Sequence, residues 1–108
     1  MEELLQVANL VANKLNSRFK DDPEKLRMLQ GLKVQEEAGE LAQAIIGALG
    51  LNPNKGHSHT WDHVRAEACD TALTALVTLC MLGGDPEWFL TEHLRTIRTK
   101  AEGWEGTA

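Results

Sequence analysis

Apolar residues recur every three or four positions along most of this chain, which is the spacing of one face of an α-helix. The first such run extends from about Glu3 to Lys20 and has apolar side chains at positions 4, 8, 11, 15 and 19. No stretch alternates apolar and polar residues with the period of two that a half-buried strand requires. The pattern therefore predicts an all-α fold.

Helix start signals divide the rest of the chain. Asp-Pro-Glu occurs at positions 22–24 and again at 85–87, where each copy combines an N-cap, a proline at the first helical position and an acid in the first turn. Thr60 is expected to cap a helix from about Trp61 to Leu82. The last helix should run from about Pro86 to Glu102. Its inward side chains should be Phe89, Leu90, Leu94 and Ile97.

The segment that begins at Pro23 is expected to kink or break at Gly31, before an acidic helix from about Leu32 to Leu49. Gly50 should end that helix, and the Asn, Pro and Gly residues of positions 51–56 should form a loop. Positions 105–108 are expected to be a frayed tail. The chain is thus predicted to be a single domain, residues 1–108, that resembles a four-helix bundle, a fold in which facing helices can build metal sites.

Composition narrows the range of partners. The chain has 108 residues, of which 43% are hydrophobic and 25% charged, as is ordinary for one globular domain. Its net charge of -5 argues against binding to a nucleic-acid polymer, which requires a surplus of Lys and Arg. No apolar run approaches the roughly 20 residues of a membrane span. We expect no membrane partner.

Location is predicted from the N-terminus and the cysteines. Met1-Glu2-Glu3 lacks the basic region of a signal peptide. Cys69 and Cys80 fall about 16 Å apart along one predicted helix, too far for a disulfide, and are expected to be buried thiols. A reducing, cytoplasmic location is predicted.

Two pairs of carboxylates carry the predicted chemistry. Glu37 and Glu40 lie three positions apart, as do Glu67 and Asp70 on the next predicted helix. Residues at i and i+3 are neighbours on a helix face, so antiparallel packing of the two helices would bring four carboxylates together. Oxygen ligands suit Mg²⁺ or Mn²⁺ and not Zn²⁺ or copper. A Glu-Glu-x-x-Glu run alone is usually a solvated helix face, but with the second pair it predicts a divalent metal site.

The neighbours of these acids favour the same interpretation. Glu37 and Glu40 share a helix side with Leu41 and Ala44, where a merely solvated charge would not lie. Gly39 costs about 1 kcal/mol relative to alanine inside a helix, which suggests a packing or access requirement. The sequence has no Ser-His-Asp or Cys-His arrangement and no glycine-rich phosphate loop that would offer an alternative to the metal-site interpretation.

These motifs resemble a known family. The segment Lys33-Val-Gln-Glu-Glu-Ala-Gly-Glu40, followed by Glu67-Ala-Cys-Asp70, is similar to the all-α nucleoside triphosphate pyrophosphohydrolases of the MazG type. The similarity covers roughly positions 26 to 101. It implies a dimer or dimer of dimers that cleaves a nucleoside triphosphate to the monophosphate and pyrophosphate with Mg²⁺. It also implies a role for each acid: Glu37, Glu40, Glu67 and Asp70 match the metal ligands, and Glu36 matches a residue that supports the ligands or activates water.

Substrate contacts are predicted from basic and aromatic residues. Arg95, Arg98 and Lys100 cluster near the end of the last helix, where they would bind phosphates or simply favour the helix dipole. Lys33 is a further phosphate candidate that could instead pair with Glu37. Lys55, in the loop, is a weaker one.

Trp61 is the candidate for contact with the base, although tryptophans in small helical proteins more often fill a core or an interface. Thr74 stands where the family often has an aromatic residue, and the chain has no tyrosine, so base selectivity is open. His57, His59 and His63 lack a cysteine or carboxylate to complete a zinc site and are expected to form a polar loop.

The sequence as a whole predicts a nucleoside triphosphate pyrophosphohydrolase. Two alternatives stay open: a phosphoribosyl-ATP pyrophosphohydrolase, and a non-catalytic helical protein that binds a nucleotide or another partner through a vestigial site. A homodimer or homotetramer is expected, because apolar faces such as that of Leu4, Val11 and Leu15 need to be covered.

Overall fold

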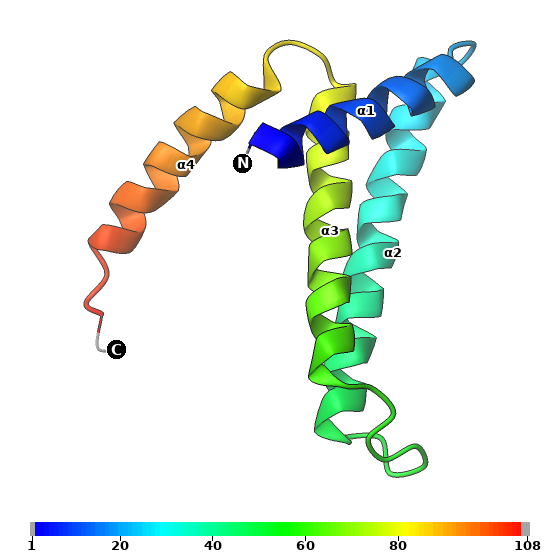
Figure 1. Cartoon of the computed structure of the whole chain (residues 1–108), viewed down its shortest axis with the longest axis vertical. Coiled ribbons are helices and arrows are strands. Elements are labelled where there is room, and N and C mark those ends of the chain that lie inside the picture. Colours follow the sequence, from blue (N-terminus) through cyan, green and yellow to red (C-terminus); the bar gives the residue numbers. More distant parts are fainter. Residues whose placement is uncertain (1, 107–108) are drawn as a thin grey trace.

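The computed structural model describes residues 2–106, which form four α-helices and no strand. The helices are α1 (Glu2–Arg18), α2 (Pro23–Leu49), α3 (Trp61–Met81) and α4 (Pro86–Glu102) (Figure 1). The all-α prediction is confirmed. Met1, part of the N-terminus predicted to lack a signal peptide, and Thr107 and Ala108 of the predicted tail lie outside the described residues.

The central unit is an antiparallel hairpin of α2 and α3, and α1 crosses one end of it (Figure 1). The core lies at this crossing and is made mostly of small and medium side chains. Its buried members are Ala8, Ala12, Leu26, Val77, Cys80 and Met81. Alanines let the helix axes approach closely, so a thin core still excludes water at the crossing.

Three helices begin at the residues that the sequence predicts. The Asp22 carboxylate accepts a hydrogen bond from the Lys25 backbone N–H at 3.1 Å, and Asp85 accepts one from the Trp88 N–H at 3.0 Å. Thr60 and His63 form a reciprocal capping box, in which each side chain accepts a hydrogen bond from the other's backbone N–H. Side-chain acceptors thus satisfy backbone donors that a helix start leaves free.

A break at Gly31 is not found. The helix runs without interruption for 27 residues from Pro23 to Leu49. The segment that begins at Pro23 and the predicted acidic helix are therefore one element. A single glycine costs only about 1 kcal/mol in a helix, which the packing of α2 against α3 offsets.

Gly50 ends α2 as predicted. Its φ of 66° lies in the left-handed region, and the chain closes with hydrogen bonds from Gly50 N–H to Gly47 O and from Leu51 N–H to Ile46 O. This is the Schellman arrangement, which favours glycine because other residues are strained at that φ. It turns the chain back so that the loop of residues 51–60 lies against the end of α2.

The inward face predicted for α4 is wrong for the single chain. No residue of α4 is buried, and Phe89 and Leu94 are 56% and 44% exposed. Gly83 and Gly84, with φ of 80° and 74°, turn the chain so that α4 diverges from the hairpin, with α3 between α4 and α2 (Figure 1). The chain alone therefore does not close a four-helix bundle.

The face of α1 and the state of the cysteines also differ from expectation. Leu5 is buried in place of Leu4, because the crossing angle turns positions 5, 8 and 12 toward the core. Cys69 is exposed on α3, whereas Cys80 is buried, and its burial raises the pKa of the Cys80 thiol. Both cysteines are free.

Among residues 2–106, no helix is both long and apolar enough to cross a bilayer.

Candidate metal centre

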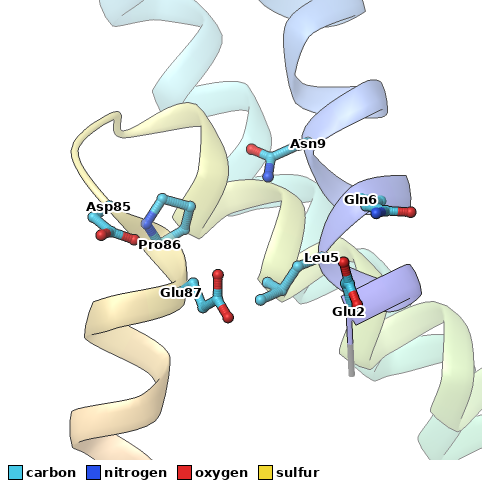
Figure 2. A pocket seen from close by; sticks show the side chains of 7 residues that line it. All are labelled: Glu2, Leu5, Gln6, Asn9, Asp85, Pro86 and Glu87. Carbon is cyan, nitrogen blue, oxygen red and sulfur yellow. The ribbon is translucent and has the colours of Figure 1, made fainter.

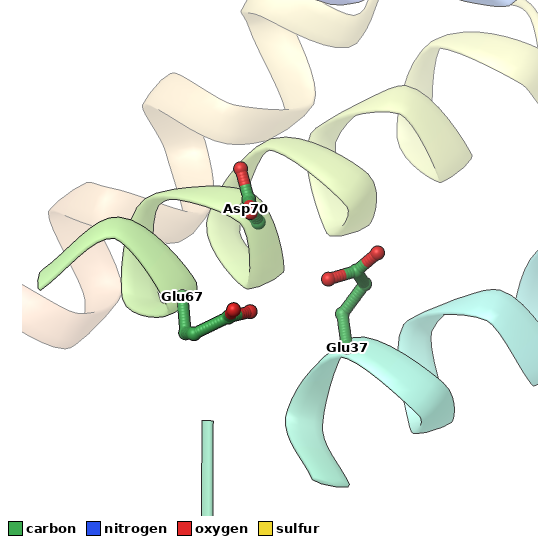
Figure 3. A group of neighbouring side chains, drawn as sticks. All are labelled: Glu37, Glu67 and Asp70. Atoms are coloured by element: carbon green, nitrogen blue, oxygen red, sulfur yellow. The ribbon is translucent and has the colours of Figure 1, made fainter. Parts of the chain in front are cut away.

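Three carboxylates meet midway along the hairpin. Glu37 of α2 and Glu67 and Asp70 of α3 each offer an oxygen atom, and these oxygens all lie within 4.8 Å of one another. Figure 3 shows Glu37 and Glu67 reaching toward each other between the two helices, with Asp70 one turn along α3. Within residues 2–106 this is the only group of three or more possible metal ligands. The antiparallel hairpin thus joins the two acidic motifs as predicted.

Burial distinguishes Glu37 and Glu67 from a solvated acidic face, whereas Asp70 is exposed. Glu37 is only 9% exposed, and one carboxylate oxygen of Glu67, Oε2, is buried with no hydrogen-bond partner among the described residues. A buried acceptor without a partner costs about 1–3 kcal/mol, and more when it is charged. The Glu67 oxygen therefore needs a cation or a donor that the described side chains do not provide.

Lys33 supplies part of the missing positive charge. Its Nζ lies 2.9 Å from Glu36 Oε1 and 3.2 Å from Glu37 Oε1. Hydrogen bonds to Glu36 and then to Glu37 raise the pKa of Lys33, so it stays protonated. One ammonium group beside five neighbouring carboxylates leaves the site strongly negative.

Glu40 lies at the edge of the cluster. It is exposed and is not among the three converging ligands, which departs from the predicted four-carboxylate cage. The negative charge of Glu37, then desolvation and then the charge of Glu67 raise the pKa of Glu40. The charges of Glu37 and Glu67 thus act on Glu40, although it is not one of the three converging carboxylates.

Two residues that the sequence did not single out hold the two helices together here. The Thr71 hydroxyl donates to the backbone carbonyl of Glu67 at 2.8 Å and lies 3.2 Å from that of Glu37. The Gln30 side chain, itself buried, donates from Nε2 to the Thr74 carbonyl at 3.2 Å. The sequence signal for both residues was a polar side chain at a core-facing position of a helix. Such a side chain needs a hydrogen-bond partner across the helix interface.

Donor chemistry indicates which ion fits. Carboxylate oxygens on two facing helices, with no sulfur or nitrogen ligand in the group, match Mg²⁺ and Mn²⁺ better than Zn²⁺. The unpartnered Glu67 oxygen is the direct sign of a fit, since a cation would satisfy it. Glu37, Glu67 and Asp70 would hold the ion, and Glu40 stands beside them.

Trp61 and Thr74 are not part of the carboxylate group. Trp61 is 49% exposed at the first position of α3, and six residues before Glu67 place it about 120° round the helix from that carboxylate. The Thr74 hydroxyl donates to the Asp70 carbonyl at 2.7 Å, which commits its proton to the helix backbone.

The basic residues of α4 are not brought to the carboxylates within one chain. Arg95 pairs with Glu92 at 3.1 Å and Arg98 with Glu102 at 3.0 Å, while Lys100 is exposed on the same helix. Because α3 stands between α4 and α2, these cations lie away from the hairpin's acidic interface (Figure 1).

Two cavities within residues 2–106 lie away from the three carboxylates. One, of about 270 Å³, is formed between the starts of α1 and α4 and is lined by acids and by Leu5 and Pro86 (Figure 2). Another is formed by the end of α2 and the loop before α3, which holds His57 and His59 but not His63. His57 Nδ1 lies 3.0 Å from the Ala48 carbonyl and His63 caps α3, as expected of structural polar residues.

Comparison with known proteins found no matching family model, no matching curated protein and no matching solved structure. The function proposed below is therefore supported by the motifs and the geometry of this chain alone.

Proposed function

We propose that this protein is a Mg²⁺-dependent (or Mn²⁺-dependent) nucleoside triphosphate pyrophosphohydrolase, which cleaves a ribo- or deoxyribonucleoside triphosphate to the monophosphate and pyrophosphate. One observation carries the proposal: three carboxylates from two helices converge, and one of their oxygens is buried without a partner. The spacing of these acids, with Lys33 and Glu36 before them, supports the resemblance to MazG-type enzymes.

The carboxylates and Thr71 would have different roles in the site, according to their positions. Glu37, Glu67 and Asp70 would hold the ion from both sides of the hairpin, with Glu40 completing the set. A bound divalent ion supplies neutralisation of phosphate charge and a lower pKa for a coordinated water. Thr71 ties together the backbones that carry Glu37 and Glu67, so it fixes the distance between the two halves of the site.

Glu36 and Lys33 stand beside the ligands. Glu36 is exposed and is held by Lys33 at 2.9 Å, so its carboxylate remains available to accept a proton from an attacking water. Lys33 donates to both glutamates, and its exposed ammonium group would also be available to a phosphate oxygen of a substrate bound beside them.

We also propose that the chain works as a homodimer or homotetramer. The apolar residues of α4 are uncovered, as are Leu4, Val7 and Leu10 of α1, and a monomer rarely exposes so much apolar surface. Val11 and Leu15 already pack on the chain's own core, so the uncovered face of α1 is smaller than the sequence suggests. Covering α4 with a second copy would complete a four-helix arrangement and place Arg95, Arg98 and Lys100 near a partner. The free cysteines fit a reducing location such as the cytoplasm.

The test is a hydrolysis assay over a panel of nucleoside and deoxynucleoside triphosphates and phosphoribosyl-ATP, with Mg²⁺, with Mn²⁺ and with a chelator. Products are identified by ³¹P NMR. We expect metal-dependent release of pyrophosphate and a monophosphate, with turnover at least roughly 100-fold lower in Asp70→Asn because a ligand is lost. Asp62→Asn is the matched control, since Asp62 is exposed on the same helix and pairs only with Arg65.

Two outcomes would contradict the proposal. If no substrate in the panel is hydrolysed, but one of them is bound, the chain is a binding protein and not an enzyme. If Asp70→Asn and Asp62→Asn retain the same activity, the hydrolysis does not depend on this carboxylate group.

A further inference from the structure

The loop between α2 and α3 forms a polar cavity against the end of α2, which we call the loop pocket. Its volume is about 230 Å³, and Ile46 and Gly47 contribute its wall on the helix side. The polar side chains that line it are Gln43, Asn52, Lys55, Ser58 and His59. None of the lining residues is acidic.

The loop pocket continues the flank of α2 that carries Glu36 and Glu40. Gln43 and Gly47 follow Glu36 at seven and eleven positions, so they lie on the same side of the helix. At 1.5 Å per residue, Gln43 lies about 4.5 Å and Gly47 about 10 Å beyond Glu40. A polyphosphate chain held beside Glu36 and Glu40 would therefore extend along this flank of α2 toward the pocket's near edge.

The pocket offers unused hydrogen-bond donors and a positive charge. Within residues 2–106, Lys55 has no carboxylate within ion-pair distance, and the Gln43 amide has no hydrogen-bond partner. Asn52 uses its Oδ1 to accept from the Asn54 N–H at 3.0 Å, which leaves its amide N–H₂ free to donate. An ammonium group with neutral amide donors and no acid is a set of groups that binds phosphate oxygens.

The wall of the pocket leaves no space for a larger residue at Gly47. A Cβ on Gly47 would lie 2.7 Å from Ser58 Oγ and still closer to the His59 ring. Ser58 Oγ and His59 Nδ1 are themselves 3.0 Å apart. The loop thus packs directly on the helix backbone, so the pocket's donors are held in place and not left on a free loop.

We propose that the loop pocket binds the terminal phosphate of the triphosphate substrate, with Lys55 as its charged contact. This assignment depends on the proposed pyrophosphohydrolase function for the identity of the substrate. When the bond between the first and second phosphates is cleaved, the leaving group is pyrophosphate. The loop pocket would hold the far end of this leaving group. Selection of a triphosphate over a diphosphate would then reside in the loop and not in the metal ligands.

The test uses the full chain labelled with ¹⁵N and inorganic tripolyphosphate as the probe, with Mg²⁺ present. Amide shifts of residues 52–59 are followed in the wild type, in Lys55→Gln and in Lys14→Gln. Lys14 is the matched control, because it is exposed on α1 at the opposite end of the hairpin and its substitution changes the net charge equally (Figure 1). We expect saturable shifts in all three, with affinity about tenfold weaker only in Lys55→Gln, as for the loss of one charged hydrogen bond.

Absence of saturable shifts at residues 52–59 in the wild type, or equal affinity in the two variants, overturns the proposal. Hydrolysis by the wild type, measured in parallel, decides the pyrophosphohydrolase function separately. Shifts that depend on Lys55 without any hydrolysis would keep the pocket as a polyphosphate site and reject the enzyme. Hydrolysis without such shifts would keep the enzyme and reject the pocket.

Discussion

The α2–α3 hairpin and α4 use apolar residues in opposite ways. The hairpin buries small residues such as Ala44, Gly47 and Ala48, and it also encloses the charged side chain of Glu37. In contrast, α4 has a regular apolar face with Phe89 and Leu94 and buries none of it. Of these two regions, the one with the weaker amphipathic pattern is the one that packs.

This difference shows what an apolar stripe does and does not establish. Helical spacing identifies the helix face that needs to be buried. The surface that buries it can belong to the same chain or to another copy of the chain. In the hairpin, close approach of the helices through alanine and glycine brings carboxylates together. In α4, the large apolar side chains are exposed in the single chain.

The largest expected effect separates folding from assembly. Leu94→Asp should leave the monomer folded, because α4 contributes nothing to the core, but should weaken self-association by about 100-fold or more. Val77→Asp, a charge placed in the core, should instead prevent folding. Light scattering after size exclusion and circular dichroism distinguish the two. A wild type that is monomeric at all concentrations would contradict the proposed assembly.

Overpacking tests whether the crossing of α1 is as tight as the structure indicates. Ala8 has no exposed surface, so Ala8→Leu should lower the free energy of unfolding by about 1–3 kcal/mol. Ala101→Leu, at an exposed position of α4, should change it by less than about 0.5 kcal/mol. Urea denaturation measures both. Equal effects would mean that α1 does not form this core.

The outer side of α2 should behave like α4 and tolerate change. A Cβ at Gly31 or Gly39 would meet no atom within 4 Å, so the packing requirement expected at Gly39 is not found within the chain. Gly31→Ala and Gly39→Ala should each stabilise the protein by about 0.5–1 kcal/mol. If only Gly39→Ala destabilises the assembled protein, a second copy contacts that position.

The smallest expected effect concerns protonation at the edge of the carboxylate group. Because the charge of Glu37 raises the pKa of Glu40 above 4.5, the folded metal-free chain binds this proton at a higher pH than the unfolded chain. Stability relative to Glu40→Gln should therefore fall as pH rises through the raised pKa. Without metal, Glu40→Gln should melt at a higher temperature at pH 7, and the difference should vanish below about pH 4. A constant difference across this range would exclude the coupling.

Local signals predicted the helix ends well. Asp22, Thr60 and Asp85 cap helices as expected, and Gly50 ends α2, because caps depend on neighbouring residues alone. The break at Gly31 and the inward face of α4 were predicted wrongly. Both depend on packing between distant segments, which propensity and periodicity do not determine.

The sequence predicted that three of these carboxylates converge, but not which residues hold the helices together around them. Glu37, Glu67 and Asp70 converge because i, i+3 spacing on two antiparallel helices leaves few alternatives. The exposed place of Glu40, the exposure of Cys69 and the bridging hydroxyl of Thr71 depend on the rotation of α2 against α3. That rotation is set by small residues whose pattern has no single period.

Direct titration with Mn²⁺, followed by electron paramagnetic resonance of the free ion, tests the central claim that these carboxylates bind a divalent metal. The account predicts saturable binding by the wild type and by Asp62→Asn, and binding at least roughly tenfold weaker in Glu67→Gln, which removes the charge of the carboxylate whose Oε2 is buried without a partner. Saturable binding that is equal in Glu67→Gln, or no saturable binding by the wild type, would contradict it.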